Sequence, residues 1–406
     1  MSGAGLASTV AASPARWHAP AILAVLAAQG CAALADNALL IVAIALLEAR
    51  AAPDWLTPAL RVGFYASYVL LAPLAGRWAD TWSKGRLMSA VNLVKLAGVL
   101  ALAGGAHPLL VFAAIGCGAA AYAPARYGML PELTAGRELV RANAAMEIVT
   151  ITAIIGGYAL GSALVGRAGT VTSCAVLAVL YALGAAATAA LRRAPLPPTL
   201  AGLSFGAAAR ILLADDAARH SLLLTSIFWS AAAVLQFLMI AWARHSLGLS
   251  LGDAALLPAV LAVGMVAGAL LAGAWPAPPG ARAATGCAIA LGAAIVLMPL
   301  AQGVAAACAL LALAGVLAGA LLVPMNAVLQ QRGASLMAPG LSVALQNSVE
   351  NGLSIVFLAA YGGAIALGSS VNAAIYGLGV VVVVLVSLNA GAARCITRTP
   401  TGNPPC

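Results

Sequence analysis

Five charged side chains lie inside long apolar stretches of the sequence: Asp36, Lys95, Arg126, Glu147 and Glu350. A charge at the centre of a bilayer costs at least about 2.5–3.5 kcal/mol on insertion scales, so each should face a polar cavity or another charge. The three acids and two bases can be structural ion pairs, or they can line a polar chamber. We favour the chamber, because Asn143 lies four residues before Glu147 and so shares its helix face. Gln346 and Glu350 have the same spacing.

The composition decides the surroundings of these charges. The chain has 406 residues, of which 63% are hydrophobic and 8% are charged, whereas a soluble domain is about half apolar and about a quarter charged. So few charges cannot cover a surface that faces water. The composition excludes a cytosolic enzyme, a disordered chain and a nucleic-acid-binding module, and it indicates a helical membrane protein.

Twelve apolar stretches, bounded by Pro, Gly or charged residues, are long enough to cross a bilayer as helices. They fall near residues 19–47, 59–79, 86–105, 108–130, 139–166, 170–191, 219–245, 254–275, 283–300, 303–330, 338–365 and 370–392. Several exceed the minimum length, so we expect tilted or curved helices.

The Lys and Arg residues predict the orientation of these spans. If both termini are cytoplasmic, the opposite side holds only Arg50, Arg61, Arg167 and Arg244, and most other basic residues lie in the cytoplasm. Basic residues favour cytoplasmic loops. We therefore predict that both termini are cytoplasmic, and we read the net charge of +9 as a topology signal rather than as a nucleic-acid-binding surface.

The spans divide into two sets of six. We predict a bundle over residues 1–192, a cytoplasmic linker over 193–218, which is rich in Pro near its start, and a second bundle over 219–406. Features recur at nearly one spacing in the two halves: Pro124 and Pro324, Glu147 and Glu350, Arg86 and Arg282. Two six-helix repeats with a substrate site between them form the major facilitator architecture. We therefore predict an all-α membrane protein with twelve transmembrane helices in two pseudo-symmetric bundles.

The segment 76–86, between the second and third spans, resembles the signature loop of the major facilitators. Gly76 would allow two helices to approach closely, and Asp80 would bind helix-end amides or an Arg side chain. Lys84 and Arg86 would hold the cytoplasmic turn. The alternative is an ordinary basic cytoplasmic loop. The second half has no Asp at the corresponding place, so we expect a gate loop on one side only.

Six segments resemble the bacterial lysophospholipid transporter (LplT) branch of the major facilitators: 35–40, 92–96, 118–134, 142–147, 323–333 and 346–351. The resemblance covers nearly the whole chain, and 118–134 is its most specific part. It implies an inner-membrane flippase for lysophosphatidylethanolamine and lysophosphatidylglycerol. Such a protein moves these lipids from the outer to the inner leaflet, where an acyltransferase restores the second chain.

The intramembrane residues suit that substrate. A lysophospholipid head carries a phosphate, and ethanolamine adds an ammonium, so the chamber needs both cationic donors and carboxylates. We predict that Arg126 and Lys95 bind the phosphate, and that the three acids bind the amine or a coupling cation. Polar neighbours complete the predicted site: Asn37, Tyr127, Asn143, Gln236, Asn326 and Gln346.

Gln236 departs from the family pattern, which has Arg at this place in the seventh span. Arg244 lies about 12 Å further along the helix and about 80° around it, so it cannot substitute. The second half should therefore hold a phosphate less strongly. We predict no cofactor and no metal site, because the seven cysteines are scattered and form no CxxC pair. Whether Na⁺ or H⁺ drives transport stays open, and we expect a monomer.

Two other functions remain open. A proton-coupled exporter of small molecules or drugs would use the same acids as proton carriers. A membrane-embedded lipid-modifying enzyme is less favoured, because no His has an Asp five positions on and no HExxH is present. The GxSxG pattern at 202–206 lies in the linker rather than between a strand and a helix. We therefore predict a transporter and not an enzyme.

Overall fold

The structure, a computed structural model, describes residues 16–52, 56–191, 203–249, 254, 256–274 and 281–396. The first half contains α1 (Pro20–Ala49), α2 (Leu56–Leu70), α3 (Ala72–Thr81), α4 (Lys84–Ala103), α5 (Pro108–Leu133), α6 (Gly136–Arg167) and α7 (Thr170–Ala189). The second contains α8 (Phe205–Ala214), α9 (Asp216–Ser246), α11 (Leu257–Ala274), α12 (Ala281–Leu297) with the 3-10 turn η1 (Met298–Leu300), α13 (Val304–Leu336), α14 (Pro339–Ala366) and α15 (Val371–Ile396). All regular structure in these residues is helical.

Eleven helices in the described part of the chain are long and apolar enough to cross a membrane. The all-helical prediction is confirmed, but the second predicted span is not one helix. It is divided into α2 and α3, which meet at Leu71 immediately before a helix start that contains Pro73. Proline has no amide hydrogen to donate and its ring clashes with the preceding turn, so the helix is interrupted there. Together α2 and α3 take the place of the predicted second span, and the other eleven predicted spans correspond to the eleven long helices.

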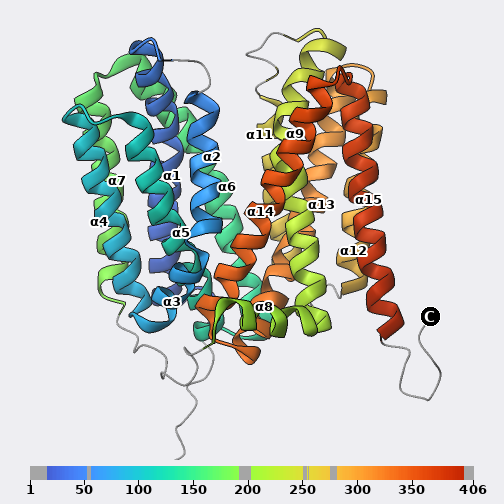
Figure 1. Ribbon diagram of the computed structural model, residues 1–406, viewed down its shortest axis with the longest axis horizontal. Coiled ribbons are helices and arrows are strands. Elements are labelled where there is room, and N and C mark those ends of the chain that lie inside the picture. The colour runs from blue at the N-terminus through green and yellow to red at the C-terminus, as the bar shows by residue number, and fades with distance from the viewer. Residues whose placement is uncertain are drawn as a thin grey trace, which may run out of the picture.

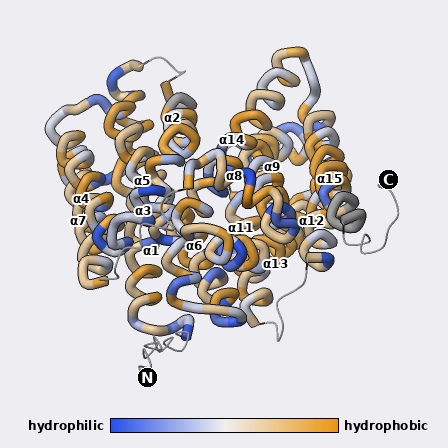
Figure 2. The backbone as a smooth tube through the Cα atoms, turned by 60° about the horizontal axis from the view of Figure 1, so that its bottom comes forward, coloured by the Kyte–Doolittle hydropathy of each residue, from blue (hydrophilic) through white to orange (hydrophobic). Residues whose placement is uncertain are grey.

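Figure 1 shows two helical bundles, one made of α1–α7 and the other of α9–α15. Their ribbons lie close together at the end that carries α3 and α8 and diverge toward the opposite end. We call the end that carries α3 and α8 the linker end, because α8 lies within the predicted linker. Residues 193–202 of that linker are outside the described residues. Hydrophobic residues dominate the helices, as the hydropathy colours in Figure 2 show.

Glycines allow several helices to pack backbone to backbone. The glycine pairs 264–268 on α11 and 315–319 on α13 face each other, and a Cβ added to Gly268 would lie 2.1 Å from the carbonyl oxygen of Val316. The pair 157–161 on α6 packs against α1 in the same way. These four-residue spacings of glycine therefore serve close helix packing, since no side chain fits at these positions.

Apolar packing also joins the two halves. One buried cluster combines residues of α1, α4, α5 and α6 with Ala269 and Ala272 of α11 and Val323 and Ala327 of α13. The backbone of α11 approaches α6 so closely that a Cβ on Gly273 would lie 3.0 Å from that of Ala144. The halves are therefore in direct contact near the linker end, and the polar residues discussed next lie among these helices.

Candidate functional site

Lys95 on α4 and Asp36 on α1 form a buried ion pair. The Lys95 Nζ lies 2.9 Å from Oδ1 and 2.6 Å from Oδ2 of Asp36, and the Tyr181 hydroxyl donates to Oδ1 at 2.7 Å. The rings of Tyr122 and Tyr181 each lie with their centroids 5.7 Å from the same ammonium. Lys95 is 1% exposed and Asp36 17%. In this conformation the ammonium of Lys95 is paired with the Asp36 carboxylate, so it is not available to bind a phosphate.

Arg126 on α5 is in a different situation. It is half-buried, and its guanidinium carbon lies 4.1 Å from the ring centroid of Tyr127. Its Nε is buried without a hydrogen-bond partner, and no carboxylate of the described residues forms an ion pair with it. Arg126 is thus an intramembrane cation with unused hydrogen-bonding capacity, and its planar fork suits an oxyanion.

A chain of hydrogen bonds connects the other predicted residues across the two halves. The Oε1 atom of Glu147 on α6 accepts from the Tyr127 hydroxyl at 3.3 Å and from the Asn326 Nδ2 on α13 at 3.2 Å. The Asn326 Oδ1 accepts from Gln346 Nε2 on α14 at 2.9 Å, and the same Nε2 donates to Glu350 at 2.8 Å. The structure therefore brings five predicted residues together. Two of them, Glu147 and Glu350, are carboxylates that have no basic partner at ion-pair distance among the described residues.

A buried pair of side-chain amides lies one helical turn from this chain of hydrogen bonds. Asn143 Nδ2 donates to Gln330 Oε1 at 2.9 Å, and Gln330 Nε2 donates to Asn143 Oδ1 at 2.9 Å. Asn143 is fully buried and Gln330 is 3% exposed. Asn143 was predicted to bind substrate, but here its amide atoms are used in contacts with Gln330 and with the carbonyl of Leu139.

Asp80 on α3 joins the halves at the linker end. Its two carboxylate oxygens accept from the backbone amides of Gly340 and Leu341, at 2.7 and 2.8 Å, in the first turn of α14. That helix has no side-chain cap of its own, so Asp80 satisfies amides that would otherwise lack acceptors. A Cβ on Gly340 would lie 2.6 Å from Asp80 Oδ1, and one on Gly76 would lie 2.9 Å from the Cβ of Ala344. Both glycines permit this contact.

The other two residues of the predicted gate loop do not reach the second half. Lys84 is the first residue of α4 and is buried; its Nζ pairs with Glu132 of α5 at 2.6 Å and lies 4.0 Å from Asp80. Arg86 is exposed and forms no hydrogen bond or ion pair with the residues that the structure describes. Lys84 therefore lies beside Asp80 in the first half, and its contacts stay within that half.

Two predicted residues are not joined to the site. Asn37 donates to the carbonyl of Ala33 in its own helix and faces Gly157 of α6. Gln236 on α9 is half-buried and has no hydrogen bond among the described residues. Sequence reasoning also left two residues out of the site, Gln330 and Tyr181. Gln330 lies in a segment that carries the family resemblance, whereas a lone Tyr in an apolar helix gave no signal.

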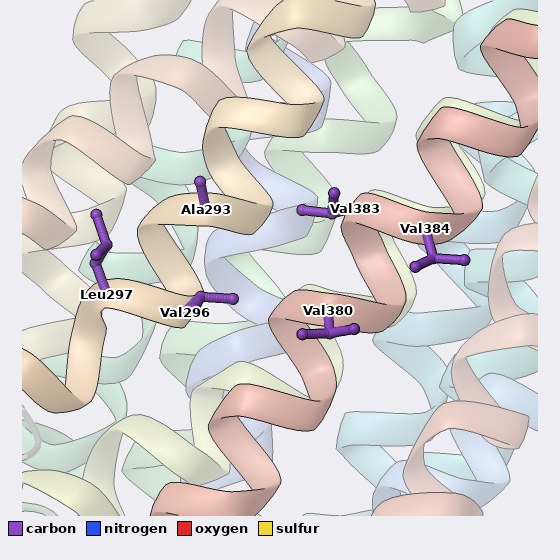
Figure 3. A pocket seen from close by; sticks show the side chains of 6 residues that line it. All are labelled: Ala293, Val296, Leu297, Val380, Val383 and Val384. Carbon is purple, nitrogen blue, oxygen red and sulfur yellow. The ribbon is translucent and has the colours of Figure 1, made fainter.

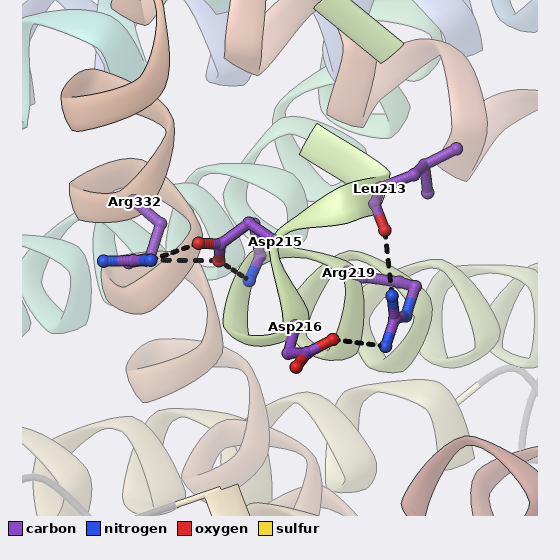
Figure 4. A network of polar contacts seen from close by, with 6 residues as sticks. Leu213, Asp215, Asp216, Arg219 and Arg332 are labelled. Atoms are coloured by element: carbon purple, nitrogen blue, oxygen red, sulfur yellow. Dashed lines mark hydrogen bonds and ion pairs between the residues drawn. The ribbon is translucent and has the colours of Figure 1, made fainter. Parts of the chain in front are cut away.

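A second network ties the predicted linker to the second half (Figure 4). Asp215 follows α8 and caps α9 by accepting from the Ala218 amide at 2.9 Å, and it also forms an ion pair with Arg332 of α13. Beside it, Arg219 pairs with Asp216 at 2.6 Å. The hydrogen bond from Arg332 lowers the pKa of Asp215 below its ordinary value. The carboxylate is therefore charged at neutral pH, and α8 is held against α13.

An apolar groove of about 350 Å³ lies between α12 and α15 (Figure 3), and its walls are Ala293, Val296, Leu297, Val380, Val383 and Val384. No polar side chain lines it, so it cannot hold a charged head group. Among the described residues, no His, Cys, Asp and Glu side chains group as metal ligands would.

Comparison with known proteins identifies the family. Residues 25–357 match the sequence profile of the Major Facilitator Superfamily. The chain is 40% identical over 358 residues to the lysophospholipid transporter LplT of Pectobacterium carotovorum subsp. carotovorum (strain PC1), covering 86% of this chain and 88% of that protein. This chain belongs to the LplT family. LplT of Serratia proteamaculans (strain 568) is 38% identical over 348 residues, which cover 84% of this chain and 87% of that one.

The fold of this LplT homologue agrees with solved structures. The transporter FucP, crystallised in the outward conformation, superposes with a TM-score of 0.74 at 13% identity, over 93% of this chain and 99% of that chain. At this identity the likeness concerns the fold alone. The chain is therefore a multi-pass membrane protein with the major facilitator fold, and it belongs to a transporter family rather than to an enzyme family.

Proposed function

We propose that this protein moves lysophosphatidylethanolamine and lysophosphatidylglycerol from the outer to the inner leaflet of the bacterial inner membrane, where an acyltransferase restores the second chain. The curated relatives are named lysophospholipid transporters. The observation that carries the proposal is Arg126, a half-buried cation without a carboxylate partner in the described residues, next to a chain of hydrogen bonds that contains Glu147 and Glu350.

The arrangement suits a zwitterionic head group. The Arg126 guanidinium would donate two parallel hydrogen bonds to the phosphate. This geometry matches two oxygens of a tetrahedral phosphate better than it matches a monatomic anion. The ammonium of ethanolamine, or a hydroxyl of glycerol, would donate to Glu147 or Glu350. These two acids are also our candidates for a coupling H⁺ or Na⁺. The single acyl chain needs no polar partner and would stay among apolar helix surfaces.

Transport would follow from alternating access of the two halves. If the linker end is cytoplasmic, as the distribution of basic residues predicts, the Asp80 contact with α14 and the buried amide pair close the protein toward the cytoplasm. A head group would then enter from the outer side and leave after these contacts break. The predicted linker, residues 193–218, contains α8, and the ion pair of Asp215 with Arg332 binds it to the second half.

The second candidate is proton-coupled export of small molecules or drugs. Glu147 and Glu350, which have no basic partner in the part of the chain that the structure describes, favour it, because such carboxylates can carry protons. Arg126 favours the lipid instead, since an unpaired guanidinium repels the cationic compounds that acidic sites attract. A substrate with a phosphate satisfies both features, and a simple cation satisfies only one.

Reconstitution into proteoliposomes tests this proposal. A fluorescent lysophosphatidylethanolamine is added to the outer leaflet, and the fraction that albumin can extract is followed over time. We expect the protein to accelerate its loss from the extractable pool relative to protein-free vesicles, and lysophosphatidylglycerol to compete. No acceleration, together with proton-dependent uptake of a cationic drug, would replace the flippase by the exporter.

A further inference from the structure

Two hydrogen-bonded contacts connect α6 of the first half with α13 of the second. The first is Glu147 with Asn326, and the second is the reciprocal pair of Asn143 with Gln330. The two residues on α6 are four apart, and so are the two on α13, in the opposite direction. The two residues of each helix therefore share one face, and the antiparallel helices meet through two successive contacts. We call each of these hydrogen-bonded contacts between α6 and α13 a rung.

The two rungs differ in chemistry. The rung of Asn143 and Gln330 is neutral, and each amide donates to the other and accepts from it, so neither depends on a ligand. The rung of Glu147 and Asn326 depends on one oxygen, Oε1, which accepts from Asn326 and from Tyr127. If a ligand donates a hydrogen bond to this oxygen in place of Asn326, the contact between Glu147 and Asn326 is lost. Asn326 keeps its hydrogen bond to Gln346, which lies in the same half. Only the charged rung can therefore sense a head group.

Burial makes the neutral rung a barrier. Asn143, Glu147, Asn326 and Gln330 are all at most 4% exposed. Separation of the halves must expose or rehydrate these groups, because buried amides without partners are strongly disfavoured. As long as both rungs hold, α6 and α13 cannot move apart, and nothing can pass between them toward the linker end.

We propose that the two rungs are the inner gate of the linker end, and that a head-group donor opens this gate by taking Glu147 Oε1 from Asn326. The opening of the gate by a head group rests on the proposed function, because it requires that a lysophospholipid head reaches Glu147. The existence of the gate does not rest on it, since the gate is a property of the protein without substrate. Gln330 and Asn143 thereby act as positioning residues that hold the site closed rather than as substrate ligands.

Spin labels at the linker end test the gate without substrate. Ala135 and Ala334 are exposed, lie in opposite halves and can carry labels as cysteines after the seven native cysteines are replaced. Asn143→Leu, and separately Gln330→Leu, should shift the population to longer distances. The matched control is Gln29→Leu, which removes a buried amide bonded to Thr150 within the first half. This control should leave the distances unchanged.

An exchange of side chains tests whether the pair itself matters. Asn143→Gln combined with Gln330→Asn can re-form both hydrogen bonds and should restore the short distance. If Asn143→Leu does not fold, Asn143→Asp serves in its place, because its carboxylate faces the Gln330 carbonyl oxygen and should also widen the linker end. Unchanged distances in these variants, or widening of equal size in the Gln29 control, would overturn the gate.

Addition of lysophosphatidylethanolamine to the labelled protein tests the opening step. The parent protein should widen, and Glu147→Gln should not, because its amide oxygen can still accept from Asn326 but carries no charge to attract the ammonium. Widening in Glu147→Gln equal to that of the parent would overturn this step. If the parent neither widens nor flips the lipid while Asn143→Leu still widens, the proposed function fails and the gate stands.

Discussion

The ammonium of Lys95 lies 2.9 and 2.6 Å from the two carboxylate oxygens of Asp36. Tyr181 adds a hydrogen bond to the same carboxylate. This pairing satisfies two of the five intramembrane charges within the first half, and it leaves Arg126 as a cation without a carboxylate partner in the described residues. Of the two arrangements that the sequence offered, the structural ion pair is therefore present at Asp36 and Lys95. Arg126 stays our candidate for the ligand site.

Lys95→Met should destabilise the protein strongly. It leaves the Asp36 carboxylate without its cation, and breaking a buried pair in this way costs about 3–5 kcal/mol. The double variant Lys95→Met with Asp36→Leu should recover most of this loss, because no charge remains unpaired. The measurement is the thermal unfolding midpoint in detergent. A single variant as stable as the parent, or a double variant as unstable as the single, would show that the pair is not structural.

Asp80→Ala should weaken the closure of the linker end. The variant loses two hydrogen bonds from a charged acceptor to the Gly340 and Leu341 amides, and such bonds contribute about 1.5–3 kcal/mol each. We expect the distance between labels at positions 135 and 334 to increase. Asp216→Ala is the control, since it removes a carboxylate that is 40% exposed and paired with Arg219 within α9. Equal distances in both variants would contradict this role of Asp80.

Asp215→Asn should lower stability by an amount that does not change between about pH 5 and about pH 7.5. Arg332 lowers the pKa of Asp215 in the folded protein. The ion pair therefore contributes fully above the ordinary Asp pKa of about 3.9, and its contribution is lost as the pH falls through the lower folded value. Asn keeps the helix cap, so the variant removes the charge alone. The unfolding midpoints of parent and variant at each pH provide the measurement, and a difference that already narrows near pH 5 would contradict the lowered pKa.

Much of the fold could be predicted from the sequence, because helix length and apolar composition are local properties. The exception was the second span, where Pro73 divides an apolar run into α2 and α3. The site was predicted in part. The four-residue spacing placed Glu147 and Glu350 on polar helix faces, but spacing says nothing of the register between distant helices.

That register decided the roles of individual residues. Asp80 binds amides of Gly340 and Leu341 from the other half, and Asn143 binds Gln330 rather than facing an open chamber. Lys95 could equally have faced the chamber or Asp36, because both positions lie in apolar helices. Only the packing of α1 and α4 against α7 distinguishes these cases, and packing of helices in space leaves no periodic signal in a single chain.

The flipping rate of lysophosphatidylethanolamine by Arg126→Ala in proteoliposomes tests the central claim most directly. The control is Arg141→Ala, which removes a partly exposed guanidinium that pairs with Glu138 within the first half. Loss of charged hydrogen bonds to the phosphate should reduce the rate about tenfold or more, and Arg126→Lys should retain part of it because the charge remains. Arg141→Ala should flip at the parent rate. An Arg126→Ala protein that is folded and flips the lipid as fast as the parent would contradict the account.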